Sequence, residues 1–74
     1  MIKDTIGTDA GIIWQLLFEK NILSISEIEE HTSIDPFNMV LAIGWLAREN
    51  KIHFLTENDT LYVELISTPS DIYY

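Results

Sequence analysis

The sequence predicts an α+β domain of the winged helix-turn-helix class, in which three helices are followed by a β-hairpin. Three observations lead to this prediction. Apolar residues recur at helical spacing over about residues 5–20. Two further helix starts follow, at Ser26 and Asp35. Two alternating segments, 52–56 and 61–66, are separated by turn residues and predict a hairpin that would form the wing.

The chain has 74 residues, which is the size of one domain. We expect the winged helix to cover residues 1–68 and a short aromatic tail to cover 69–74. A hydrophobic content of 47% argues against disorder. The sequence contains no Cys, so neither a disulfide nor a thiolate metal site supplements the small core.

The first predicted helix carries one apolar stripe. Its spacing of four, three and four residues is typical of the buried face of a helix. The stripe comprises Ile6, Ala10, Ile13 and Leu17, and we expect Ile12 and Leu16 to broaden it.

Small and aromatic residues lie beside this stripe. Gly7 and Gly11 are four residues apart and predict a smooth patch where another helix crosses closely, with Gly44 as the matching residue. Trp14 and Phe18 lie on a flank of the helix, where they are candidates for a protein interface.

The second predicted helix begins with a capping box. Ser26 is followed three residues later by Glu29, and each side chain would accept a hydrogen bond from the other residue's amide. Acidic residues in a first turn also suit the helix dipole. The local glutamates therefore have a structural explanation, and we do not assign them to catalysis. Asn21 ends the preceding helix, and residues 22–25 are expected to form a short strand.

The third predicted helix begins at an N-cap, Asp35, followed by Pro36, which is favoured at the first helical position. It should continue to about Glu49, with Asn50 as its end signal. The turn residues of the following hairpin are 57–59.

Residues 37–47 of this helix include a single polar residue, Asn38. Met39, Ile43 and Leu46, with Ala42 and Ala47, are the predicted core stripe, and Phe37, Val40 and Gly44 lie between it and a second stripe. The second stripe comprises Asn38, Leu41, Trp45 and Arg48. A helix that is apolar nearly all round is normally covered all round.

We therefore predict a protein interface, most simply a homodimer, with a second protein as the other option. The candidate interface residues are Trp14, Phe18, Leu41, Trp45, Tyr73 and Tyr74. The alternative, that Trp45 packs on Trp14 or on the wing of its own chain, stays open.

The charge distribution disfavours nucleic acid. The formal net charge is −8, and residues 21–47 contain no Lys or Arg, although phosphate contacts dominate DNA affinity. A DNA-binding regulator is the alternative function, and its contacts would come from Asn38, Arg48 and Lys51.

Other chemistries have weaker support. His31 and His53 are isolated and lack the spacing of metal ligands. The sequence has no Gly-rich phosphate loop or nucleophile motif, so we expect no cofactor, no small-molecule ligand and no enzymatic activity. With no apolar run near 20 residues and no signal peptide pattern, we expect a soluble, cytoplasmic protein without a membrane partner.

Two segments resemble a known family. They are Ile6-Gly7, Ala10-Gly11 and Trp14 in the first helix, and the run AIGWLARENKI at residues 42–52. Together they are similar to a small bacterial winged helix-turn-helix family of unknown function, over nearly the whole chain. The resemblance implies a winged-helix fold and a homodimer. It implies no established activity, substrate or ligand.

Overall fold

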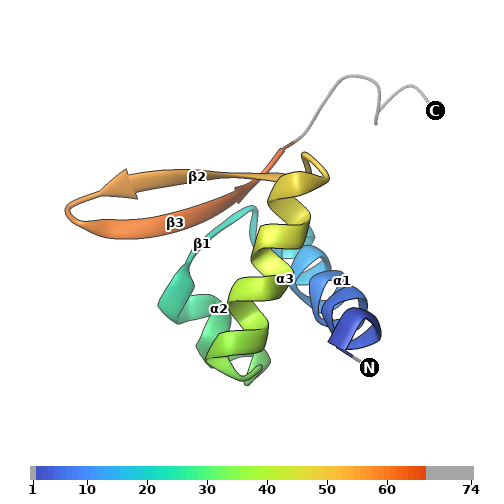
Figure 1. The fold of residues 1–74 in the computed structure, drawn as a ribbon. Helices are drawn as coiled ribbons and strands as arrows, with labels where there is room; N and C mark the ends of the chain where they lie inside the picture. Colours follow the sequence, from blue (N-terminus) through green and yellow to red (C-terminus); the bar gives the residue numbers. More distant parts are fainter. Residues whose placement is uncertain (1, 67–74) are drawn as a thin grey trace.

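The computed structural model describes residues 2–66, with side chains from residue 5 onward. The elements are α1 (Ile2–Lys20), β1 (Ile22–Ser24), α2 (Ile25–Thr32), α3 (Pro36–Arg48), β2 (Ile52–Glu57) and β3 (Thr60–Leu65). Figure 1 shows the three helices gathered on one side, with the β2–β3 hairpin projecting away from them as a wing. The predicted winged-helix architecture is confirmed, and α1 begins earlier than predicted.

The cap of α2 differs from the prediction. The N-cap is Ser24, whose hydroxyl accepts a hydrogen bond from the amide of Glu27 at 3.1 Å. The Glu27 carboxylate in turn accepts from the Ser24 amide at 2.8 Å. Ser26, the predicted N-cap, lies inside α2. The capping box is present, but it begins two residues earlier than the sequence pattern suggested.

The start and end signals of the other helices are confirmed. The Asp35 carboxylate accepts hydrogen bonds from the amides of Phe37 at 3.0 Å and Asn38 at 3.3 Å, and Pro36 is the first residue of α3. Asn21 and Asn50 follow the ends of α1 and α3 with φ angles of 72° and 59°. Left-handed asparagines of this kind commonly terminate helices.

The sheet is antiparallel, with the order β1-β3-β2. Asn58 and Asp59 connect β2 to β3 with φ angles of 51° and 63°. Positive φ at both central residues is the requirement of the type I′ turn, which matches the twist of a hairpin. The short strand β1 pairs Leu23 with Val63, so the base of the wing is held against the helices.

The core lies where α1, α3 and the base of the sheet meet. The predicted stripes are largely confirmed, because Ile13 and Leu17 of α1 are fully buried and all of Met39, Ala42, Ile43 and Leu46 are buried. The prediction for Ile12 was wrong. Its side chain is 46% exposed, because it lies on the side of α1 away from α3.

The glycines do not mark a close helix crossing, contrary to the prediction. A Cβ atom added at Gly7, Gly11 or Gly44 would find no neighbouring atom within 4 Å. These positions are open to solvent rather than pressed against a second backbone. Gly7 and Gly11 instead form part of the floor of a surface groove.

Candidate interaction surface

The side of α3 that points away from the core is apolar from Phe37 to Gly44 and ends in the basic residue Arg48. Phe37 is 68% exposed and Val40 is 62% exposed, and both are among the large hydrophobic side chains left uncovered. Leu41 is half-buried beside them, and Gly44 is exposed. We call these four residues the outer face of α3. In a DNA-binding winged helix this surface would enter the major groove, where polar and basic side chains are needed.

An aromatic pair on α1 adds to the exposed apolar area. The rings of Trp14 and Phe18 lie 5.4 Å apart with an angle of 26° between their planes. Trp14 is half-buried, whereas Phe18 is 64% exposed. Stacking fixes the orientation of the Phe18 ring on the surface.

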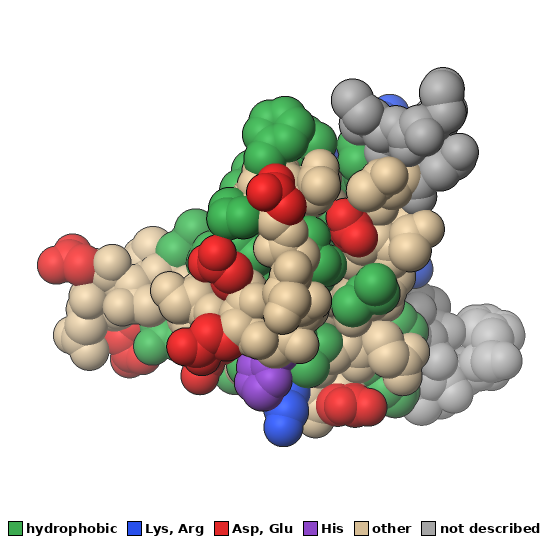
Figure 2. Space-filling view, turned by 90° about the horizontal axis from the view of Figure 1, so that it is seen from below, with side chains coloured by type: hydrophobic (Ala, Val, Ile, Leu, Met, Phe, Trp, Pro, Cys, Tyr) green, Lys and Arg blue, Asp and Glu red, His purple; other side chains and the backbone are tan. Residues whose placement is uncertain are grey.

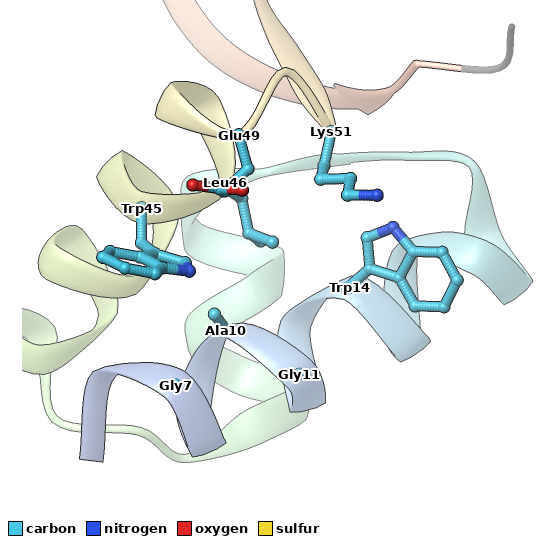
Figure 3. A pocket seen from close by; sticks show the side chains of 8 residues that line it. All are labelled: Gly7, Ala10, Gly11, Trp14, Trp45, Leu46, Glu49 and Lys51. Carbon is cyan, nitrogen blue, oxygen red and sulfur yellow. The ribbon is translucent and has the colours of Figure 1, made fainter. Parts of the chain in front are cut away.

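A groove of about 400 Å³ runs between α1 and α3 (Figure 3). Its lining comes from both helices and from the turn after α3, and comprises Gly7, Ala10, Gly11, Trp14, Trp45, Leu46, Glu49 and Lys51. Figure 3 shows the two indole rings on opposite sides of the groove, with Ala10 between them at its base. The rim carries one acid and one base, whereas the floor and walls are apolar.

The sequence left two roles open for Trp45, which are contact with a second protein and packing within its own chain, and this residue is partly exposed and partly packed. It is 37% exposed, so most of its surface is already packed within the chain. It does not stack on Trp14, since the groove separates the two indoles. The remaining exposed edge faces the groove.

The predicted DNA contacts are not gathered into one patch. Asn38 is half-buried near the start of α3, whereas Arg48 is exposed at its end. They are ten positions apart along the helix, which corresponds to about 15 Å. Lys51 lies beyond α3 at the rim of the groove.

Acidic side chains are prominent on the wing and on the side of the molecule that Figure 2 shows. The tip of the wing carries Glu57 and Asp59. Figure 2 shows acidic side chains spread over the wing and among the hydrophobic side chains, with Lys and Arg at the margins of that view. This distribution gives a DNA backbone little to bind.

The histidines and acids of residues 2–66 form no group of three or more that could hold a metal ion. Nε2 of His53 lies 2.6 Å from a carboxylate oxygen of Glu64, and these residues face each other across β2 and β3. This contact between neighbouring strands gives His53 a structural role in the wing. In the same part of the chain, no helix is long and apolar enough to cross a membrane.

Sequence reasoning missed the two most exposed apolar residues of α3. Phe37 and Val40 were placed between the two stripes and were not assigned to the interface, although they expose more than Leu41 and Trp45 do. At 100° per residue, Phe37 lies nearly opposite the buried stripe, so the helical angle alone was a sufficient signal. Of the other candidate interface residues, Tyr73 and Tyr74 lie outside the described residues.

Comparison with known proteins supports the fold and identifies the family. The structure resembles the solution NMR structure of protein BT2368 from Bacteroides thetaiotaomicron, with a TM-score of 0.79 and 34% sequence identity, over 88% of this chain and 79% of that one. The sequence is 40% identical over 63 residues to the uncharacterized protein MJ1608 of Methanocaldococcus jannaschii, covering 81% of this chain and 89% of that protein.

A family model matches almost the entire described region. The match covers residues 1–65, from the start of α1 to the end of β3. It therefore includes all three helices, the wing and the groove. The chain belongs to the winged helix-turn-helix domain family DUF2582.

Proposed function

We propose that this winged helix is a non-enzymatic interaction module that forms a homodimer through the outer face of α3, with Phe18 of α1 as a further exposed aromatic residue. The observation that supports this proposal is the exposure of Phe37 and Val40, at 68% and 62%, on the helix that other winged helices use for recognition. Contiguous exposed apolar residues commonly mark a protein interface.

The charge of the chain favours this surface over others for self-association. Two copies that each carry a net charge of −8 repel one another at long range. A homodimer therefore needs a contact surface without like charges opposite one another. The four residues of the outer face and Phe18 contain no ionisable side chain, and the charged residue that follows them along the same side of α3, Arg48, is basic. The wing tip instead places Glu57 and Asp59 in any contact made there.

The exposed aromatic area is sufficient for the centre of an interface. An aromatic side chain contributes about 200 Å², so Phe18 and Phe37 each expose roughly 130 Å². A stable interface covers about 800 Å² on each partner, and a few central side chains supply most of its energy. In a two-fold dimer each anchor acts twice, because the same patch lies on both copies.

Sedimentation equilibrium of the full chain tests the homodimer. An interface with a Kd near 1 µM, equivalent to about −8 kcal/mol, gives a predominantly dimeric protein at about 100 µM. A monomeric mass at that concentration would refute the proposal. The mass should also rise with salt or stay constant, since screening weakens repulsion between acidic chains.

The alternative function is a DNA-binding regulator, which is favoured by the helix-turn-helix arrangement and by two exposed basic residues, Arg48 at the end of α3 and Lys51 after it. Amide shifts of labelled protein, titrated with a mixed-sequence duplex at about 20 mM salt, give phosphate contacts their best opportunity. We expect a flat titration. Shifts clustered in residues 33–51 and 56–60 would favour the regulator and locate its surface.

A further inference from the structure

The groove between α1 and α3 is apolar but unfilled by the residues that line it. Its floor includes Gly7 and Gly11, where an added Cβ would contact nothing within 4 Å. Its walls are Trp14 and Trp45, which are the two tryptophans of the chain. A volume of about 400 Å³ between two indoles is sufficient for one or two aromatic side chains.

The last described residue, Ile66, lies beside this groove. The amide of Ile66 donates a hydrogen bond to the carbonyl of Lys51 at 2.9 Å. Lys51 lines the groove, and its own amide donates to the carbonyl of Leu46, another lining residue, at 3.0 Å. The backbone that follows β3 is thus attached directly to the rim (Figure 1).

Eight residues, 67–74, follow Ile66, and an extended chain of that length reaches about 26 Å. They consist of a polar stretch, Ser67–Asp71, followed by Ile72, Tyr73 and Tyr74. A segment on so short a linker is present at its site at an effective concentration in the millimolar range. Weak apolar contacts are therefore sufficient to hold it.

We propose that Tyr73 and Tyr74 dock in the groove between Trp14 and Trp45 of their own chain. The aromatic side chains would pack on the indoles and against the open backbone at Gly7 and Gly11. Of the two charged rim residues, Lys51 suits Asp71 of the linker, whereas Glu49 repels it. If the tail docks in this way, we expect Asp71 to lie near Lys51 rather than near Glu49.

This inference is separate from the proposed homodimer, which is centred on the outer face of α3; Phe18 stacks on Trp14 but does not itself line the groove. If the tail covers the edge of Trp45 in its own chain, that edge is not available to a second copy. The two proposals are therefore tested by different variants. Phe37→Ser addresses association, whereas substitutions in the groove and the tail address docking.

Nuclear Overhauser effects in the labelled full chain provide the first test. We expect contacts from the Tyr73 or Tyr74 ring protons to the indole protons of Trp14 and Trp45, and we expect them to persist in Phe37→Ser. Gly11→Leu places a side chain in the groove and should abolish them. The matched variant Gly44→Leu, at an equally open helical glycine outside the groove, should preserve them.

Two outcomes would overturn the inference. Absence of these contacts, with tail amide shifts equal to those of a free peptide, would show that the groove is not occupied by the tail. Contacts observed only between labelled and unlabelled chains in a mixed sample would show docking into a second copy.

Fluorescence gives a second readout, because both tryptophans line the groove. The double variant Tyr73→Ser and Tyr74→Ser should increase quenching by acrylamide. Quenching equal to that of the unmodified chain would contradict docking.

Discussion

Phe37→Ser is the substitution that separates association from folding most clearly. Phe37 is 68% exposed in the single chain, which is about 135 Å² of an aromatic side chain of roughly 200 Å². At about 25 cal/mol per Å², covering that area contributes up to about 3 kcal/mol in each copy of a dimer. A symmetric interface loses this contribution twice.

If the two copies together lose only a third of this binding free energy, about 2 kcal/mol, the Kd of the dimer still rises roughly thirty-fold. The buried third of the ring limits the cost to folding to about 1.6 kcal/mol, which a domain of ordinary stability tolerates. We therefore expect sedimentation equilibrium to show a monomer, while circular dichroism shows a folded protein with a modestly lower Tm.

A matched control lies on the wing. Phe54 is also an exposed phenylalanine, at 46%, but it belongs to β2 and not to the outer face of α3. Phe54→Ser should leave the Kd of self-association unchanged. If Phe37→Ser and the unmodified chain associate equally well, or if Phe54→Ser disrupts association instead, the assignment of the interface to α3 is refuted.

Three further predictions test the fold. Trp45→Ala should lower the free energy of unfolding in urea by about 3 kcal/mol, because most of the indole is packed within the chain; a loss below about 1 kcal/mol would indicate that its burial contributes little. Ser24→Ala should lower the free energy of unfolding by about 1 kcal/mol in the same assay, because the α2 cap is lost. Ser26→Ala, inside the helix, should cause no measurable loss, and the reverse order would show that the cap is at Ser26. Asp59→Gly should raise the Tm, because Asn-Gly is favoured over Asn-Asp in a type I′ turn, and a lower Tm would argue against this turn geometry.

The elements that the sequence predicted well are those with local chemical signals. Asp35 and Pro36 specify the start of α3 through a side-chain cap and a fixed φ, and neither depends on distant residues. Asn58 and Asp59 similarly specify a hairpin turn because both tolerate positive φ.

The start of α2 could not be assigned locally. Ser24 and Ser26 each precede a glutamate by three residues, at Glu27 and Glu29, so the sequence contains two overlapping capping boxes. The choice depends on where β1 ends, and β1 ends where Ser24 pairs with Tyr62 of β3. That contact joins residues far apart in the chain, and therefore no local pattern reports it.

The groove was unpredictable for a related reason. Small residues on one side of a helix are compatible with close packing and with an open surface, and the outcome depends on how α1 and α3 cross. Here Ala10 and Leu46 are buried, whereas Gly7 and Gly11 are left uncovered. From the sequence, Trp14 and Trp45 were named only as candidate interface residues, and no pattern indicated that both line one groove.

The chemistry of α3 explains why the fold by itself does not assign DNA binding to this chain. A recognition helix must stay soluble when unbound and attract phosphates when it meets DNA, and basic side chains satisfy both needs. On α3 the equivalent surface carries Phe37 and Val40, which water solvates poorly and phosphates do not attract. The free energy of such a surface falls when another apolar surface covers it. This chemistry is the physical basis for proposing an apolar protein surface, rather than DNA, as the partner of α3.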